Sequence, residues 1–471
     1  MTQIQSQSQS QSTIVIGGGI AGLTVAYRLQ SAGGDVTLLE ANDQIGGPVQ
    51  TVLSEGFLAE LGPNTILETS PRVTALVTDL GLDEQKVYAN DASAKRFLVR
   101  NKQPHALPSS PGGMLTTPLF SPMGKLGMVK ELFKGSWDNR YEESLAQFVV
   151  RRLGKEFLDY VINPFVAGVY AGDPEHLSVK HGFPKLYELE QKYGGLVKGQ
   201  IKGAKERKKR QEKSKQAARM FSFKGGLKML PEMLATKLGN AVRKNARVTD
   251  ISQIDGKWQV SFSTGGGAVT QLQAEKVIYA GTAFGIPNLT VNGRPEPEFK
   301  PFDEIYHPPV FSLTLGFKRE DVQHPLDGFG MLIPKVEGFN ILGALFTSTL
   351  FPMRAPQDHV TLTIFIGGVR QPELAAKPVD ELITLALVDL KVTLGVTGKP
   401  VYTHHQFWPK AIPQYDVGYG QYKDRLDELE SRYPGLYFTG NYRNGISVAD
   451  TIKNAVELSD RLLGIEPEED T

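Results

Sequence analysis

The chain has 471 residues, of which 40% are hydrophobic and 22% are charged, and its formal net charge is +1. This length excludes one small domain and predicts two or three units with sizeable cores, while the near-neutral charge gives no strong attraction to nucleic acid. The chain has no cysteine, which excludes disulfides, thiolate metal sites, thiol nucleophiles and a flavin linked through sulfur.

Both ends of the chain are predicted to be disordered tails. Residues 1–12 form a Gln/Ser repeat without the features of a signal or transit peptide, and residues 465–471 are acidic. No uninterrupted apolar run approaches the roughly 18 residues of a membrane-spanning helix. We therefore expect a bacterial-type cytoplasmic protein, with any membrane contact peripheral.

The N-terminal unit opens with a strand, a glycine-rich turn, a helix, a second strand and an acidic residue. The strands are predicted at Thr13–Ile16 and Val36–Leu39, the helix at Leu23–Ser31, and Glu40 ends the second strand. This order is typical of a Rossmann-type βαβ unit that binds a dinucleotide.

The glycines and the acid have separate tasks in binding a dinucleotide. Gly17 allows the tight turn, Gly19 lets the backbone approach a pyrophosphate, and Gly22 lets the helix pack closely on the strand. The helix N-terminus supplies free N–H groups and a partial positive charge to the phosphates. Glu40 can accept hydrogen bonds from a ribose hydroxyl and repels a 2′-phosphate, so NADP is disfavoured.

The residues after Glu40 distinguish FAD from NAD. Ala41 is followed by a second glycine pair, Gly46 and Gly47, which an NAD site does not need. This pair resembles the extended fingerprint of FAD oxidoreductases related to amine oxidases. Many of those proteins carry Arg after the pair, where this chain has Pro48, so one phosphate contact is missing while the close backbone approach remains.

The middle of the chain changes from a helical stretch to a strand-rich stretch. Residues 112–200 are rich in helix formers, and Ser144–Arg152 and Lys155–Val161 have helical spacing. The basic run Lys202–Lys215 is interpreted either as a solvated segment or as a contact for anionic lipid headgroups. The other predicted elements are a strand at Ala94–Val99, a helix from Gly225 to about Leu238, strands at Ala246–Asp250, Trp258–Ser263, Lys276–Ala280, Phe311–Phe317, Phe329–Ile333, Asn340–Phe346 and Val360–Phe365, and a helix at Val379–Gly395.

The C-terminal segment repeats the order strand, glycine turn and helix. A strand at Gly435–Thr439 leads into Gly440, and Ser447 is a suitable N-cap for a helix over Val448–Leu462. Such a helix N-terminus stabilises the negative charge that a flavin acquires on reduction. We therefore expect both glycine turns to flank one cofactor. No second GxGxxG follows a strand, which favours an oxidase that passes electrons to oxygen or a quinone.

These patterns predict an α/β fold with three units. Residues 13–90, 221–290 and 410–464 are assigned to a discontinuous Rossmann-type FAD-binding domain, and residues 91–111 and 291–409 to a mixed-sheet substrate-binding domain. Residues 112–220 are expected to form an inserted helical domain that associates with a membrane.

Several stretches resemble one family, the oxygen-dependent protoporphyrinogen oxidases, and together they span residues 13–463. The block NPFVAG at Asn163–Gly168, with Gly172–Pro174, is the most specific because related amine oxidases lack it. The other matching stretches are Gly62–Thr65, Lys95–Phe97, Phe221–Gly226, Pro325–Gly330, Leu342–Phe346, Phe407–Pro413 and Gly440–Asn441 with Gly445. The resemblance implies an FAD enzyme that converts protoporphyrinogen IX to protoporphyrin IX with O2 as acceptor and H2O2 as product. It also implies a membrane-associated helical domain and often a homodimer.

The resemblance assigns substrate-binding residues as well. Arg96 matches the arginine that pairs with a substrate propionate, and a guanidinium fork suits a carboxylate. Val310, Leu326 and Phe346 match positions that enclose the flat macrocycle, whereas periodicity alone assigns these three to the core. The family often has Leu where Val310 stands, so looser packing is expected there.

Further matching residues are expected around the cofactor. Asn64 matches a position close to both flavin and substrate, and Gly168 lies where the macrocycle passes close to the backbone. Val248 is expected on the adenine side, and Trp408 and Val448 along the flavin. The predicted cofactor-binding residues are Gly17, Gly19, Gly22, Glu40, Ala41, Gly46, Gly47, Val248, Trp408, Gly440, Asn441, Ile446, Ser447 and Val448, and no metal site is predicted.

The implied chemistry needs little acid–base machinery, and no His/Asp/Glu constellation is evident in the sequence. A porphyrinogen has weak meso C–H bonds, so the main task is to hold one of them against flavin N5. No protein side chain is therefore assigned as catalytic.

Three other interpretations stay open. Related flavoenzymes oxidise coproporphyrinogen III to coproporphyrin III, but its four carboxylates predict more basic residues at the site, and the Lys95–Phe97 match favours the dicarboxylate. An amine or polyene oxidoreductase of the same fold is disfavoured by the missing Arg after Gly47 and by the NPFVAG block. A binding protein without chemistry, such as the escort proteins of prenylated GTPases, usually loses the C-terminal glycine turn that this chain keeps.

Overall fold

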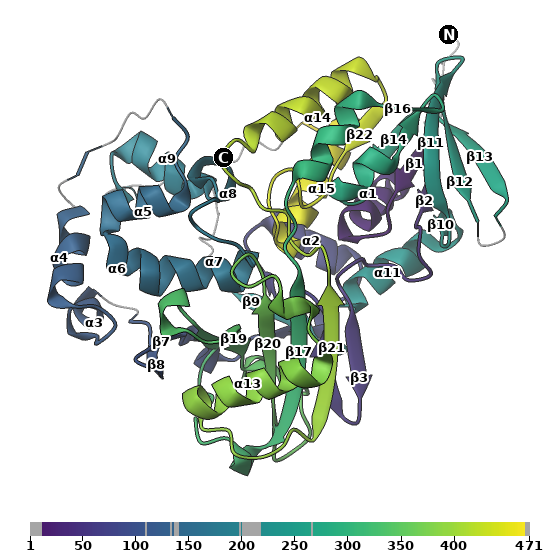
Figure 1. Cartoon of the computed structure of the whole chain (residues 1–471). Coiled ribbons are helices and arrows are strands. Elements are labelled where there is room, and N and C mark those ends of the chain that lie inside the picture. Colours follow the sequence, from purple (N-terminus) through teal and green to yellow (C-terminus); the bar gives the residue numbers. More distant parts are fainter. Residues whose placement is uncertain are drawn as a thin grey trace, which may run out of the picture.

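The computed structural model describes residues 12–108, 111–131, 134–135, 141–196, 199, 218–264 and 267–466. The basic run Lys202–Lys215 lies outside the described residues, as do the predicted tails apart from residues 12, 465 and 466. Figure 1 shows three groups of elements: helices α3 to α9 on the left, the strands that carry the glycine turns at the upper right, and a larger sheet below.

A parallel sheet of five strands carries both glycine turns. Its order is β10-β2-β1-β14-β22, and the strands are β1 (Ser12–Ile16), β2 (Asp35–Leu39), β10 (Val242–Arg243), β14 (Lys276–Tyr279) and β22 (Leu436–Phe438). Val277 pairs with Ile14 on one side and with Leu436 on the other. The sheet therefore joins the beginning, the middle and the end of the chain, and its apolar runs are buried as a parallel sheet requires.

Both faces of this sheet are covered. One face carries α1 (Ile20–Ser31) and α15 (Val448–Leu463), which pack against each other, together with α2 (Pro71–Asp79) and α11 (Met229–Leu238). The other face packs on a second sheet and on α14 (Gly420–Arg432). That second sheet has the order β13-β12-β11-β15-β16, with β11 (Arg247–Ile254), β12 (Lys257–Ser263), β13 (Val269–Ala274), β15 (Thr290–Val291) and β16 (Arg294–Pro295).

A mixed sheet of seven strands forms the second large body. Its order is β21-β17-β20-β19-β18-β7-β8, with β7 (Phe97–Arg100), β8 (Gln103–Ala106), β17 (Val310–Lys318), β18 (Gly330–Leu332), β19 (Ile341–Leu345), β20 (His359–Gly367) and β21 (Tyr402–Trp408). The pair β7–β18 is parallel and the other pairs are antiparallel. Helix α13 (Val379–Leu394) buries Leu382, Ala386, Leu390 and Leu394 against this sheet, at the spacing of one helix face.

Two small sheets connect these bodies. Strands β3 (Thr51–Ser54) and β4 (Phe57–Glu60) form a hairpin, and β9 (Met220–Phe223) lies between β5 (Ile66–Leu67) and β6 (Lys86–Tyr88). Strand β9 follows the helical segment in the chain. Its pairing with β5 and β6 therefore brings the chain back to the body that contains the parallel sheet. The short helix α12 (Thr347–Leu350) follows β19.

The helical unit lies between β8 and β9 in the chain. Its elements are α3 (Pro111–Thr116), α4 (Pro122–Lys130), α5 (Leu145–Leu153), α6 (Lys155–Phe157), a π-helical turn (Leu158–Ile162), α7 (Asn163–Tyr170), α8 (Val179–Gly182) and α9 (Pro184–Tyr193). None of the helices in the described part of the chain is long and apolar enough to span a bilayer.

Most predicted elements are present, with shifted limits. The first helix begins at Ile20 rather than Leu23, and the strand expected from Ala94 begins at Phe97 because Asp91–Ala94 form a 3-10 turn. Strand β21 and helix α14 were not predicted. Strand β21 alternates buried or half-buried with exposed residues at the edge of its sheet, and α14 buries only Leu426 and Leu429, so neither has a strong apolar signal.

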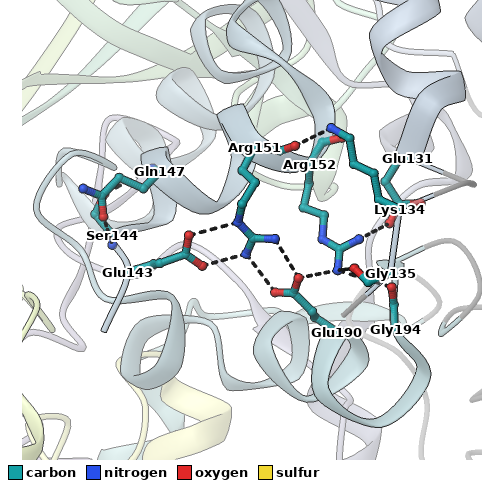
Figure 2. Close-up of polar contacts among 10 residues, drawn as sticks. All are labelled: Glu131, Lys134, Gly135, Glu143, Ser144, Gln147, Arg151, Arg152, Glu190 and Gly194. Atoms are coloured by element: carbon teal, nitrogen blue, oxygen red, sulfur yellow. Dashed lines mark hydrogen bonds and ion pairs between the residues drawn. The ribbon is translucent and has the colours of Figure 1, made fainter. Parts of the chain in front are cut away.

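A buried ion network holds the helical unit together (Figure 2). The Glu190 carboxylate on α9 accepts from Arg151 at 2.7 and 3.0 Å and also accepts from Arg152. The Arg152 side chain is fully buried, donates to the Gly135 carbonyl at 2.8 Å and lies 3.7 Å from Glu131. At the start of α5, Ser144 and Gln147 form a reciprocal capping box. The network thus fixes α5 to α9, to Glu131 and to Gly135.

The Glu190→Ala variant is expected to unfold at lower denaturant concentration, with about 3–5 kcal/mol less free energy of unfolding. The reason is that the buried guanidinium of Arg152 loses its main partner. The matched control is Lys155→Ala, which removes an exposed pair with Asp159 and should change stability by less than about 0.5 kcal/mol. Equal losses of unfolding free energy in the two variants would show that the buried network stabilises the protein no more than an exposed ion pair does.

Candidate functional site

A cavity of about 3490 Å³ runs from the two glycine turns to the space between the seven-stranded sheet and the helical unit. Its lining includes residues after β1, β2, β14 and β22, residues of β17–β19, and apolar side chains of α5 and α7. The cavity is larger than the roughly 300–1,000 Å³ typical of a site for one small ligand. It therefore has room for a dinucleotide and a second large molecule.

The first glycine turn has the geometry that the motif predicts. Gly17 has φ +110°, and a Cβ there would lie 2.9 Å from the backbone of Ala280. A Cβ on Gly22 would lie 2.0 Å from the Gly17 carbonyl oxygen, so the helix can approach the turn only with glycine at this position. Gly19, in contrast, is the N-cap of α1 and lines the cavity, and no protein atom lies within 4 Å of an added Cβ.

Glu40 is held in place by the turn that it faces. Its Oε2 accepts from the Gly18 N–H at 2.7 Å, and its Oε1 accepts from the backbone and side-chain nitrogens of Asn42 at 2.8 and 2.9 Å. The carboxylate is buried, borders the cavity and keeps lone-pair capacity for a further donor. A ribose hydroxyl is such a donor. Ala41 borders the cavity beside it.

The second glycine pair, Gly46 and Gly47, packs against the first glycine turn. The Gly46 N–H donates to the Gly18 carbonyl at 2.7 Å, and Gly47 lies close enough to Gly19 that its added Cβ would be 3.6 Å from the Gly19 Cα. Both have positive φ, +94° and +56°. Gly47 borders the cavity, whereas Gly22 and Gly46 support the turn from behind.

The C-terminal glycine turn faces the same cavity. Gly440 and Gly445 have φ +151° and +132°, and Ser447 caps α15 by accepting from the Asp450 N–H at 3.1 Å. Gly440, Asn441, Ile446, Ser447 and Val448 all border the cavity, so the N-terminus of α15 is directed into it. Val248 and Trp408 border it as well, and Trp408 Nε1 donates to the Leu61 carbonyl at 2.8 Å.

Asn64 presents an oxygen that no donor satisfies. Its Nδ2 donates to the Gly62 carbonyl at 3.1 Å, while its Oδ1 is buried and has no hydrogen-bond partner among the described residues. The residue borders the cavity and is 8% exposed. Because a buried polar atom without a partner is unfavourable, a bound molecule with an N–H or O–H group would stabilise this site.

Arg96 is one of the cations that border the cavity. Its guanidinium carbon lies 5.6 Å from the centre of the Phe329 ring, and no carboxylate pairs with it in the described part of the chain. Desolvation lowers the pKa of Arg96, although the residue keeps an exposed surface. Its neighbours are paired: Lys95 with Asp327, and Arg100 with Glu156 at 2.8 Å.

The structure brings only some of the predicted apolar residues to the cavity. Val310 borders it and pairs across the sheet with Trp408, and Gly168 borders it where an added Cβ would lie 2.4 Å from Leu332. Leu326 and Phe346 do not border it. They are 2% and 0% exposed and lie in the core of the seven-stranded sheet, on the side that packs toward α13. Their contact with substrate stays a prediction that the observed packing does not support.

Other apolar residues border the cavity instead of Leu326 and Phe346. They are Phe329, Leu332, Leu342 and Leu345 from the sheet and Phe148, Val149, Leu153, Phe157, Val161 and Phe165 from the helical unit. Alternation in β19 could not identify Leu342 and Leu345, because a register shift between Ile341 and Gly343 changes which face each residue occupies. The helical spacing of α5 indicated an apolar face but not what that face covers.

The described residues contain no group of three or more His, Asp or Glu side chains arranged to hold a metal ion. His307 is buried at the cavity, and its Nδ1 lies 2.7 Å from the Ile305 carbonyl. Burial lowers its pKa to about 4, so the ring is neutral near pH 7. The site thus offers binding groups rather than a paired acid and base.

This fold and this site define a dinucleotide-binding flavoprotein of the amine-oxidase-like α/β class. The model of the flavin-containing amine oxidoreductases matches residues 20–463, and the chain belongs to that family. It is 36% identical to protoporphyrinogen oxidase 2 of Arabidopsis thaliana, over 95% of this chain and 93% of the relative. It is 28% identical to coproporphyrinogen III oxidase of Bacillus subtilis, over 93% and 95%. A solved structure from Exiguobacterium sp. 255-15 has a TM-score of 0.80 at 24% identity and covers 96% of this chain and 98% of its own.

FAD is the cofactor of this family, and the residues present fit it. Gly19 leaves open space where a pyrophosphate approaches, the N-termini of α1 and α15 face the cavity, and Glu40 is held as an acceptor. Asn64 adds an acceptor oxygen that lacks a donor. These observations agree with the cofactor predicted from the two glycine turns.

The Gly19→Ala variant separates cofactor binding from folding. Because Gly19 has φ −72° and no protein atom within 4 Å of the added methyl group, the apoprotein should keep its stability within about 0.5 kcal/mol. The methyl group occupies the space of the pyrophosphate, so the dissociation constant for FAD should rise at least about tenfold, which is roughly 1.4 kcal/mol. Flavin fluorescence titration and thermal unfolding measure both quantities.

The contrasting variant is Gly22→Ala, whose methyl group meets the Gly17 carbonyl at 2.0 Å. It should destabilise the apoprotein itself by about 1–3 kcal/mol. If Gly19→Ala bound FAD as tightly as the wild-type protein, the pyrophosphate would not lie at this turn.

Proposed function

We propose that the protein oxidises protoporphyrinogen IX to protoporphyrin IX, with O2 as electron acceptor and H2O2 as the second product. The observation that carries the proposal is that Arg96, which has no counter-ion among the described residues, borders the same cavity as apolar side chains of β18, β19, α5 and α7. A tetrapyrrole with propionates has this distribution of apolar and charged groups. The names of the relatives support the same reaction.

The chain's residues bind and orient the substrate in this proposal. The guanidinium of Arg96 receives a propionate through its planar fork, and the apolar side chains of β18, β19, α5 and α7 enclose the macrocycle and exclude water. Val310 and Trp408, paired across β17 and β21, shape the end nearest the cofactor. Bound FAD would supply the hydride acceptor and the route of the electrons to O2.

The charge pattern near Arg96 favours a dicarboxylate over a tetracarboxylate. Coproporphyrinogen carries four carboxylates, yet Lys95 and Arg100, which lie close to Arg96 in the sequence, are already paired with Asp327 and Glu156. Extra carboxylates would therefore lose water without gaining Lys95 or Arg100 as a partner. Coproporphyrinogen III oxidation is the second candidate because the chain also has relatives with that name.

Anaerobic mixing of the purified flavoprotein with protoporphyrinogen IX tests the proposal. The flavin absorbance should bleach, and admission of air should restore it, with porphyrin fluorescence and H2O2 appearing together. The Arg96→Ala variant should raise KM at least about tenfold with a smaller effect on kcat, since a charge-assisted bond to the propionate is lost. Arg96→Lys should lie between the two because it keeps the charge without the fork.

The matched control is Lys95→Ala, whose exposed side chain pairs with Asp327, and it should leave KM nearly unchanged. Bleaching by coproporphyrinogen III but not by protoporphyrinogen IX would transfer the assignment to the second candidate. Bleaching by neither would reject porphyrinogens as substrates of this flavoprotein.

We further propose that the helical unit attaches the protein peripherally to a membrane. On α4, Met123, Leu126 and Val129 are 74%, 47% and 42% exposed at a spacing of three residues, beside Lys125 and Lys130. Apolar side chains next to lysines are typical of a helix that lies at a lipid interface. The homodimer and the cytoplasmic location stay predictions.

Co-sedimentation with vesicles that contain anionic phospholipid tests the attachment. The wild-type protein should sediment at low salt, and the double variant Met123→Ser/Leu126→Ser should bind several-fold less, since it removes exposed apolar area. The control is Val388→Ser on α13, which is 55% exposed but lies outside the helical unit. Equal binding by all three proteins would reject α4 as the contact.

A further inference from the structure

A short segment, Gln414–Val417, connects the helical unit to the C-terminal glycine turn. The Ser178 N–H donates to the Tyr415 carbonyl at 2.8 Å, and the Val417 N–H donates to the His176 carbonyl at 2.9 Å. Gln414 Nε2 donates to the Tyr170 carbonyl at 2.9 Å. The end of α7, the loop that follows it and the N-cap of α8 are therefore tied to this segment.

The side chain of Tyr415 reaches the glycine turn from the same segment. Its hydroxyl donates to the Asn441 carbonyl at 2.6 Å and accepts from the Gly445 N–H at 3.0 Å. One oxygen thus joins the two ends of the turn that leads to Ser447 and α15. The ring is 3% exposed, borders the cavity and stacks on Tyr419 with 4.1 Å between ring centres.

Between its ends the turn is also held by the Tyr419 hydroxyl, which donates to the Tyr442 carbonyl, and by the pairs of Arg443 with Asp427 and Glu430. Tyr415 differs in that it binds Asn441 and Gly445, near the two ends.

Gly440 and Gly445 have positive φ and no side chains, so rotation at either residue would redirect the residues between them. The turn delivers Ile446, Ser447 and Val448 to the cavity. The position of the α15 N-terminus relative to the cofactor therefore depends on what fixes Gly440–Gly445.

We infer that Tyr415 is a flavin-positioning residue, whose hydroxyl fixes the turn Gly440–Gly445 and couples it to the helical unit. The inference rests on FAD as cofactor and not on the identity of the substrate. A helix N-terminus stabilises the negative charge of a reduced flavin only when its N–H groups face that charge. Loss of the hydroxyl lets the turn move, so both the affinity for FAD and its midpoint potential should fall.

The test is the Tyr415→Phe variant, which keeps the ring and its stack on Tyr419. Apoprotein is titrated with FAD by flavin fluorescence, and the midpoint potential of the loaded protein is measured by dye-linked reduction. We expect about a tenfold higher dissociation constant, as for two hydrogen bonds of ordinary net strength, and a lower midpoint potential. Both bonds are present in the apoprotein, so its melting temperature should also fall by a few degrees, whereas a lower midpoint potential does not follow from lower stability alone.

The matched control is Tyr433→Phe, which removes a hydroxyl that donates to Glu296 at the end of α14, away from the cavity. Its affinity for FAD and its potential should equal those of the wild-type protein. Unchanged values in Tyr415→Phe, or equal losses in both variants, would overturn the inference.

Hydrogen exchange of residues 440–447 in the wild-type apoprotein decides the question if Tyr415→Phe does not fold. Slow exchange without FAD is expected because Tyr415 holds the turn before the cofactor binds, and fast exchange would overturn the inference. A wild-type protein that binds FAD but oxidises no porphyrinogen would reject the proposed substrate and leave this test intact.

Discussion

The cavity depends on the insertion of β14 between β1 and β22. Val277 at the centre of β14 pairs with Ile14 and with Leu436, and all three are buried at 0–2% exposure. Only this pairing places the two glycine turns at the same edge of one sheet, because the carboxyl ends of parallel strands lie together. The sequence separations are large, so the apolar burial of these short strands must outweigh a substantial loop-closure entropy.

The helical unit lines the same cavity, but charge-assisted hydrogen bonds rather than strand pairing hold it in position. Helix α5 turns apolar residues such as Phe148 and Val149 toward the cavity, while Arg151 and Arg152 bind Glu190 on α9 (Figure 2). Apolar contacts alone tolerate sliding, whereas charge-assisted hydrogen bonds are directional and fix one arrangement. A rigid α5 keeps its apolar side chains at a defined distance from the seven-stranded sheet.

The geometry of the first glycine turn could be predicted from the sequence alone. Gly17, Gly19 and Glu40 act within one short βαβ unit, so spacing along the chain is enough to assign their tasks. Arg96 required the family resemblance, because its pattern does not differ from that of any exposed arginine. What makes it distinctive is that Lys95 and Arg100 are paired and it is not, which depends on Asp327 and Glu156 far along the chain.

The sequence could not predict which face of the seven-stranded sheet each residue occupies. Leu326 lies in the core with φ +55°, and Phe346 caps α12 after the bulged strand β19, so neither follows regular alternation. Likewise, an edge strand such as β21 has a weak apolar pattern although it carries Trp408 to the cavity.

The absence of cysteine has a consequence for a chain that would release peroxide beside its own side chains. Without thiols, the sulfur atoms open to oxidation are those of its 9 methionines. Met123 on α4 and Met353 are 74% and 64% exposed. Sulfoxide formation makes a thioether side chain polar, so damage at Met123 would weaken the apolar face of α4. If α4 attaches the protein to a membrane as proposed, oxidation of Met123 would weaken that attachment.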